Sequence, residues 1–200
     1  MTTIRRSPSR GPGSPEIIGV YEPDTGSVQY IAADPATRKA ALIDVVLDFD
    51  PRHARTGTTA AQGVLQIVEA EGLEIVWILD THPHADHLMA SAWLKEQTGA
   101  PNAIGDKVRE IAQLWRKLYN LDGALDPDRD FDRLFADGET FKLGDLDVRV
   151  MLSPGHTLGS ITYVIGDAAF VHDTLMHVDA GTSRADFPGG SSADLYRSLM

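Results

Sequence analysis

The chain has 200 residues, of which 42% are hydrophobic, and this is enough for one compact domain with its own core. Its 29 acidic residues outnumber its 18 lysines and arginines, and the net charge of −11 argues against nucleic acid or an anionic membrane as a partner. The absence of cysteine excludes disulfides, cysteine-based zinc sites and a thiol nucleophile. No apolar run approaches the ~18 residues of a membrane span. We therefore expect a cytoplasmic protein that acts on small molecules.

The first fifteen residues differ in composition from the rest of the chain. Residues 1–15 are rich in Ser, Pro, Gly and Arg and contain no apolar run. A segment of this kind cannot bury enough apolar surface to offset its ordering entropy. We predict a disordered tail over residues 1–15 and a single domain over residues 16–200.

Short β-rich runs alternate with helical stretches along the remaining chain. A continuous apolar run over residues 74–79 is typical of a strand that is covered on both faces. Gly99 is placed to end a helix, and Gly144-Asp145 is a turn signal between two strand-like runs. This order predicts the α/β class. We expect strands over residues 27–32, 41–46, 74–79, 161–165 and 168–171, a hairpin over 141–152, and helices over 59–71, 87–97, 108–118 and from 191 onward.

Three histidines and an aspartate lie within six residues, directly after the predicted strand over residues 74–79. They are His82, His84, Asp86 and His87 in the sequence THPHADH. Alternate residues of an extended segment point to the same side, so His82 and His84 face one point. We expect Asp86 to cap the next helix and to place His87 on its first turn. A buried group of imidazoles without a cation would be costly, so the pattern predicts a metal site.

Two later candidate ligands also follow predicted strands. His156 lies in the turn SPGHT, and Asp173 lies in VHDT. Each alone is consistent with an ordinary turn histidine or a capping carboxylate. Together with the cluster at residues 82–87, they complete a set of ligands carried on loops that a rigid sheet holds in place.

The three motifs resemble those of a known fold family. THPHADHL resembles the HxHxDH signature of the metallo-β-lactamase fold, and SPGHT and VHDTL are similar to its next two ligand motifs, in the same order. The stretches AADPATRKAALIDVVLDFDP, LFADGETF and AGTSRADFPGGSSADLYRSL resemble one branch, the persulfide dioxygenases, including the bacterial beta-lactamase hydrolase-like proteins. The resemblance implies an αββα sandwich.

The same resemblance implies a chemistry and assigns roles to residues. In that branch two histidines and one carboxylate hold a single Fe(II), which here implies His82, His156 and Asp173. His84 and His87 would then lie beside these ligands or contribute to a second metal position, and Asp86 is the candidate catalytic residue. Glutathione persulfide and O2 are the implied substrates. A homo-oligomer is compatible with the sequence.

Two other functions stay open at this point. Zinc in the same pocket would activate water for hydrolysis, as in glyoxalase II-like enzymes that act on glutathione thioesters. Those dinuclear relatives use a further histidine from a later motif, whereas this sequence has none after His177. We expect the domain to be truncated at its C-terminus. It is then either an active enzyme or an inactive metal-binding remnant.

Overall fold

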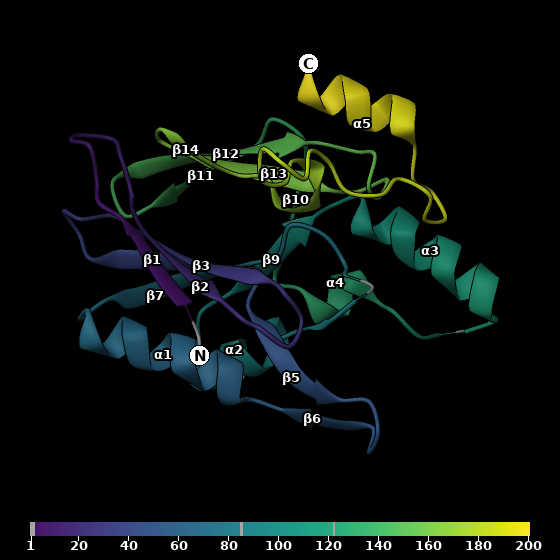
Figure 1. The fold of residues 1–200 in the computed structure, drawn as a ribbon, viewed down its shortest axis with the longest axis horizontal. Coiled ribbons are helices and arrows are strands. Elements are labelled where there is room, and N and C mark those ends of the chain that lie inside the picture. Colours follow the sequence, from purple (N-terminus) through teal and green to yellow (C-terminus); the bar gives the residue numbers. More distant parts are fainter. Residues whose placement is uncertain (1–2, 85, 122) are drawn as a thin grey trace.

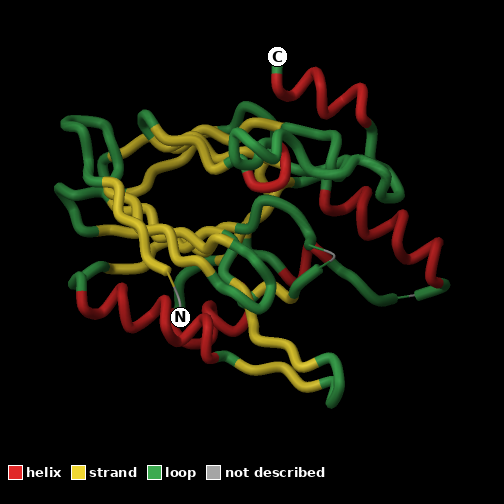
Figure 2. The backbone as a smooth tube through the Cα atoms, in the orientation of Figure 1, coloured by secondary structure: helices red, strands yellow, loops and turns green. Residues whose placement is uncertain are grey.

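The computed structural model describes residues 3–84, 86–121 and 123–200. Two β-sheets stack face to face, and helices lie on the outside of both layers (Figures 1 and 2). Helices α1 (Thr59–Ala70) and α2 (Ser91–Thr98) cover the larger sheet, and α5 (Ser192–Leu199) lies beyond the smaller one. This arrangement confirms the predicted α/β class and the αββα sandwich.

The larger sheet has seven strands in the order β1-β2-β3-β4-β7-β9-β10. Its first four strands pair antiparallel, as sequence neighbours joined by short turns do. Strands β4, β7, β9 and β10 pair parallel, and α1 and α2 supply two of the crossovers that such pairing requires. The strands are β1 (Thr3–Ser7), β2 (Glu16–Tyr21), β3 (Val28–Ala33), β4 (Lys39–Ile43), β7 (Glu74–Leu79), β9 (Asn102–Gly105) and β10 (Arg133–Phe135).

The smaller sheet is an antiparallel meander of four strands, and it confirms the predicted hairpin that turns at Gly144-Asp145. A third, short sheet in the order β6-β5-β8 extends from the main body (Figure 1). The remaining elements are β5 (Val46–Asp50), β6 (Arg55–Gly57), β8 (Leu88–Met89), β11 (Thr140–Leu143), β12 (Leu146–Leu152), β13 (Ile161–Ile165), β14 (Ala168–Phe170), α3 (Val108–Tyr119), α4 (Pro127–Asp130) and the 3-10 turn η1 (His172–Thr174). Among the described helices, none combines the length and the apolar content that crossing a bilayer would need.

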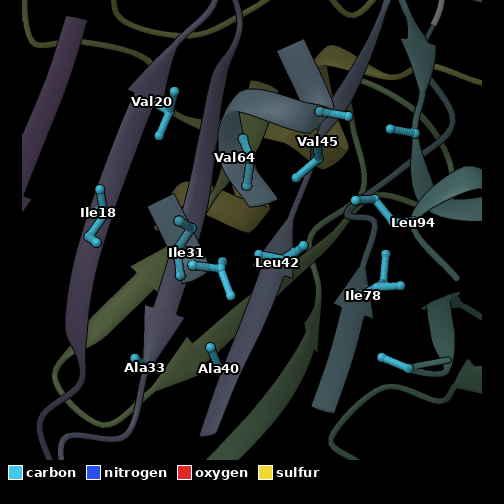
Figure 3. Packing of buried hydrophobic residues seen from close by; sticks show 14 residues of the cluster. Ile18, Val20, Ile31, Ala33, Ala40, Leu42, Val45, Val64, Ile78 and Leu94 are labelled. Atoms are coloured by element: carbon cyan, nitrogen blue, oxygen red, sulfur yellow. The ribbon is translucent and has the colours of Figure 1, made fainter. Parts of the chain in front are cut away.

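The core has two layers, because the central strands are buried on both faces. Leu42 of β4 faces α1 and α2 and packs with Ile78, Val64 and Leu94 (Figure 3). Its neighbour Ile43 points the other way, into the core between the two sheets. Successive residues of a strand alternate between faces, so a continuous apolar run serves both cores at once.

The predicted tail over residues 1–15 is wrong for part of that segment. β1 pairs antiparallel with β2 along the edge of the larger sheet, with Thr3 opposite Tyr21 and Ser7 opposite Ile17. All five of its side chains are exposed. Composition indicates only how much side-chain surface can be buried, whereas main-chain hydrogen bonds to β2 hold this strand. Residues 1 and 2 lie outside the described residues.

The single strand predicted over residues 41–46 is in fact two strands. Asp44, with a positive φ of 51°, separates β4 from β5. Its carboxylate accepts hydrogen bonds of 2.8 Å from the backbone N–H and from the hydroxyl of Thr81. These bonds hold Asp44 at the end of β4, and the chain leaves the larger sheet there.

We expect Asp34 to be a strong local determinant of stability. This buried carboxylate accepts hydrogen bonds from Ala36 N, Thr37 Oγ1 and Asp145 N, and so joins the β3–β4 turn to the β11–β12 hairpin. Asp34→Asn should lower the free energy of unfolding at pH 7 by about 2 kcal/mol, because an amide replaces an acceptor of hydrogen bonds from three donors. Urea titration measures the change. The exposed Asp147→Asn is the control and should shift stability by about 0.5 kcal/mol or less.

The same carboxylate predicts a pH dependence. Burial raises the pKa of Asp34, but its hydrogen bonds outweigh burial, and the pKa is lowered overall. A carboxyl whose pKa falls on folding stabilises the protein above its unfolded value of about 3.9, and the contribution disappears as the pH falls through the folded value. The difference between parent and Asp34→Asn should therefore be constant from pH 7 to pH 5 and shrink below about pH 4. A difference that grows with acid would contradict this role.

Candidate metal centre

The candidate ligands converge because three strands end at the same side of the sandwich. β7 leads into His82, β12 leads into the turn that carries His156, and β14 leads into η1, which carries Asp173. His82, His156 and Asp173 each offer one ligand atom, and these atoms lie within 4.8 Å of one another. The structure thus brings together residues that are up to 91 positions apart.

The geometry of this first group fits a single metal ion. Asp173 Oδ2 lies 3.3 Å from His156 Nε2 and 3.7 Å from His82 Nε2. Ligands about 2.1 Å from one ion are themselves about 3 to 3.5 Å apart. His82 Nε2 is also buried without a hydrogen-bond partner among the described residues. A buried nitrogen whose lone pair has no partner is unfavourable, and a bound cation would satisfy it.

Hydrogen bonds fix the orientation of the His156 ring. Its Nδ1 lies 2.9 Å from the backbone oxygen of Arg184, which can only accept, so Nδ1 carries the proton. The lone pair is therefore on Nε2, the atom that faces Asp173. The hydroxyl of Ser183 also contacts Nδ1 and donates to the backbone oxygen of Asp173. The loop after η1 thus fixes the position of two candidate ligands, His156 and Asp173, relative to each other.

Electrostatics keep His82 ready to bind a metal. Burial, together with the neighbouring rings of His84 and His172, holds the pKa of His82 well below its usual value. Its Nδ1 lies 3.1 Å from Thr81 Oγ1, which leaves Nε2 free to face Asp173. Metal binding needs the neutral imidazole, and this environment provides it at neutral pH.

A second group adjoins the first. His84, Asp86 and His87 also offer ligand atoms within 4.8 Å of one another. The ring of His84 is 3.9 Å from that of His82 and 4.0 Å from that of His87, measured between centroids. Asp86 Oδ1 lies 3.3 Å from His87 Nδ1, and its side chain is largely exposed. The structure therefore places the predicted residues in two neighbouring groups. Ala85, which lies between His84 and Asp86 in the sequence, is outside the described residues.

One local prediction about this segment is wrong. Asp86 does not cap a helix, because Leu88 and Met89 form β8 and pair with Leu47 and Val46 of β5. α2 begins only at Ser91. The pairing of β8 with β5 outweighs the capping preference of Asp86. His87 therefore lies in a bend before β8 and not on the first turn of a helix.

Three residues that the sequence did not indicate lie around the two groups of candidate ligands. They are Asp44, Asp80 and His172. Asp44 Oδ1 lies 3.5 Å from His84 Nε2. Burial lowers the pKa of His84, but the carboxylate of Asp44 outweighs burial, and the pKa is raised overall. Burial and the Asp44 charge raise the pKa of Asp80 to about 7. The ring of His172 packs 4.5 Å from that of His82, and burial lowers the pKa of His172 to about 3. His172 is next to a predicted ligand, which is the only signal in the sequence that could have indicated it.

His172 has an unusual backbone and a defined tautomer. Its φ is +37°, a conformation that favours glycine. Thr174 Oγ1 donates to the backbone oxygen of Ser153, so it accepts from Nε2–H of His172 at 3.2 Å. The remaining Nδ1 carries a lone pair and is buried without a partner among the described residues.

A cavity of about 700 Å³ opens beside the two groups. His84 and His156 form part of its wall, and so does Phe187, which contacts the His156 ring edge-on. β8 and α3 contribute further aliphatic and aromatic side chains to the wall. A cavity of this size holds a small organic molecule.

Comparison with known proteins identifies the family. Residues 26–200 match the family described as the metallo-beta-lactamase superfamily. The chain is 53% identical over 187 residues to the beta-lactamase hydrolase-like protein of Xylella fastidiosa (strain Temecula1), which covers 94% of this chain and 43% of the relative. It is 29% identical over 192 residues to human mitochondrial persulfide dioxygenase ETHE1, covering 94% of this chain and 63% of that protein.

A solved structure gives the same result. The crystal structure of ETHE1 from Myxococcus xanthus superposes with a TM-score of 0.70 at 29% identity, covering 98% of this chain and 68% of that one. The resemblance predicted from the three motifs is therefore confirmed. The chain spans less than two thirds of the curated relatives named above. It belongs to the metallo-beta-lactamase superfamily.

Proposed function

We propose that the protein is a persulfide dioxygenase that uses one Fe(II), held by His82, His156 and Asp173. The observation that carries this proposal is the geometry of the first group, in which two imidazole nitrogens and one carboxylate oxygen face one point. Two histidines and one carboxylate on one face are typical of non-haem iron oxygenases, because the remaining positions stay open for O2 and substrate. Relatives that are named persulfide dioxygenases support this choice.

The reaction would convert a low-molecular-weight persulfide, with glutathione persulfide as the first candidate, into sulfite and a thiol. One persulfide, one O2 and one water give one thiol, one sulfite and two protons. The S–S bond breaks, the two sulfur atoms together lose four electrons, and the two oxygen atoms of O2 accept them. Bound iron supplies the one-electron chemistry that lets O2 react with a closed-shell sulfur compound.

The residues around the site have separate tasks in this scheme. Arg184 O and Ser183 keep His156 Nε2 directed at Asp173. His84 and His87 lie beside the ligands and shape the open side. Asp86, the exposed carboxylate of the second group, contacts His87 and is our candidate catalytic residue, since it can pass the released protons to water.

Oxygen uptake tests the proposal directly. Protein loaded anaerobically with Fe(II) should consume one O2 for each persulfide and release one sulfite, because the balance above allows no other ratio. The measurement uses an oxygen electrode together with a sulfite assay. Protein treated with a chelator is the control and should be inactive. A folded sample with one iron per chain that takes up no O2 with any persulfide would remove this proposal.

The second group favours one alternative function. His84, Asp86 and His87 could hold a second ion, and two zinc ions would support hydrolysis of glutathione thioesters. Two zinc ions per chain, together with turnover of S-lactoylglutathione, would favour that alternative over the dioxygenase. The third hypothesis is that the protein is an inactive metal-binding remnant. Cooperative thermal unfolding of an active, iron-loaded sample would exclude the remnant.

A further inference from the structure

We infer that Glu22, Thr25 and Ser27 are positioning residues that fix the tautomer of His87. They lie in the turn between β2 and β3, and Ser27 is 60 positions before His87 in the sequence. Their side chains form a chain of hydrogen bonds that ends at His87 Nδ1. The tautomer itself is independent of the proposed function, whereas its effect on turnover rests on that function.

The backbone of this turn holds the carboxylate of Glu22 in place. Glu22 N donates to the backbone oxygen of Ser27 at 2.8 Å, which closes the turn. The carboxylate accepts from the backbone N–H of Asp24 at 2.9 Å and of Thr25 at 2.7 Å. Burial raises the pKa of Glu22, but its hydrogen bonds outweigh burial, and the pKa is lowered overall. At neutral pH Glu22 is therefore a carboxylate, which can only accept hydrogen bonds.

The direction of each hydrogen bond in the chain follows from this carboxylate. Thr25 Oγ1 lies 2.6 Å from Glu22 Oε2, so the hydroxyl of Thr25 donates to Glu22. Thr25 Oγ1 then accepts from the hydroxyl of Ser27, 2.9 Å away. Because that bond uses the single hydroxyl proton of Ser27, Ser27 Oγ can only accept from His87 Nδ1, at 3.3 Å. Nδ1 of His87 therefore carries a proton.

The opposite nitrogen of the neutral ring, Nε2, then keeps its lone pair. It is buried without a partner among the described residues, and the His87 ring lies 4.0 Å from that of His84 between centroids. Asp86 Oδ1 also lies 3.3 Å from Nδ1, but the Asp86 side chain is 66% exposed, so water competes for this contact. The bond to Ser27 is partly buried and holds the tautomer more firmly. In the proposed reaction, we assign the lone pair of Nε2 to the water molecule that is consumed.

Nitrogen-15 NMR of the histidine rings in the metal-free protein measures the tautomer directly. The parent should show a protonated Nδ1 and an unprotonated Nε2 for His87. Ser27→Ala removes the acceptor of Nδ1–H and should change the ratio of the two tautomers about threefold or more toward Nε2–H, because one hydrogen bond is lost. A parent in which Nε2 of His87 carries the proton would overturn the inference.

Thr25 provides a matched pair of variants that do not touch His87. Thr25→Val should change the tautomer ratio in the same direction, because Ser27 can then donate its free proton to Nδ1. Thr25→Ser keeps the hydroxyl and should give the spectrum of the parent. Thr98→Val is the control for a lost hydroxyl elsewhere, since Thr98 Oγ1 donates to Leu94 O at 2.8 Å, and it should leave the His87 signals unchanged.

Turnover of the iron-loaded protein separates this inference from the proposed function. Ser27→Ala and Thr25→Val should lower kcat about three- to tenfold and keep the KM for persulfide within about twofold, whereas Thr25→Ser should keep the parental kcat. If the tautomer changes as expected but the parent oxidises no persulfide, the dioxygenase is overturned and the tautomer assignment stands. If the parent is active but His87 keeps one tautomer in all variants, the inference is overturned and the dioxygenase stands. A change of tautomer without a loss of kcat would overturn the role in turnover.

Discussion

Replacing Asp173 by Asn is expected to reduce Fe(II) affinity by more than 100-fold, the largest effect of any single substitution at the site. Asp173 is the one anionic group among the three proposed ligands, and its Oδ2 faces both imidazoles. The amide of Asn has no net charge to offset that of the cation. Metal analysis after equilibrium dialysis, together with calorimetric titration of Fe(II) into the metal-free protein, measures the change.

Two further variants make the experiment decisive. Asp179→Asn removes an exposed carboxylate six residues away and should leave the affinity unchanged. His87→Ala should keep one metal per chain and lose about 10- to 100-fold in affinity or activity, as is typical of residues that only support the ligands. A parent that binds two metals, of which His87→Ala loses one, would show that the site is dinuclear and that the iron dioxygenase assignment is wrong.

Replacing Gly155 by Ala is expected to lower the free energy of unfolding by about 3 kcal/mol or more and to weaken metal binding as well. Gly155 has a φ of +143°, which side chains rarely tolerate, and a Cβ atom there would overlap the backbone of Leu195 in α5. Hydrogen bonds from Ser191 N to Gly155 O and from the Ser198 hydroxyl to Pro154 O fix α5 on this turn. Moving α5 away would shift His156, the next residue.

Gly72 supplies the matched control. It also has a positive φ, of +62°, but a Cβ atom there would meet no atom within 4 Å. Gly72→Ala should therefore cost only about 1 to 2 kcal/mol of backbone strain and leave metal affinity unchanged. Denaturant titration of the metal-free proteins compares the two variants. Equal losses for both would mean that the contact with α5 contributes nothing.

Local patterns in the sequence predicted much of this fold. The apolar run over residues 74–79 matches β7 at both ends, because burial on both faces leaves a continuous signature. The helix over residues 59–71 is one residue shorter as α1, and Gly99 ends α2 in the left-handed conformation, as expected. The errors arose where a distant partner decides the structure, as β5 does for β8 and β2 does for β1.

The site was predictable to the extent that its ligands share a short motif or follow a strand. His82, His84, Asp86 and His87 are close in sequence, and their grouping in space follows from that. Asp44 gave no such signal, because its role depends on Thr81, 37 positions later, and on the proximity of His84. Residues of this kind are found only when tertiary contacts are known.

The exposed strand β1 has a consequence for association between molecules. An open sheet edge offers unpaired backbone groups to the edge of another copy, which is a common route to aggregation. Here that edge is only five residues long and carries Arg5 and Arg6 in sequence. Arg6 pairs with Glu71 at 2.6 Å, so the charge of Arg5 is what would repel the same strand of an approaching copy. The short length of this edge and the Arg5 charge thus disfavour pairing between copies through β1.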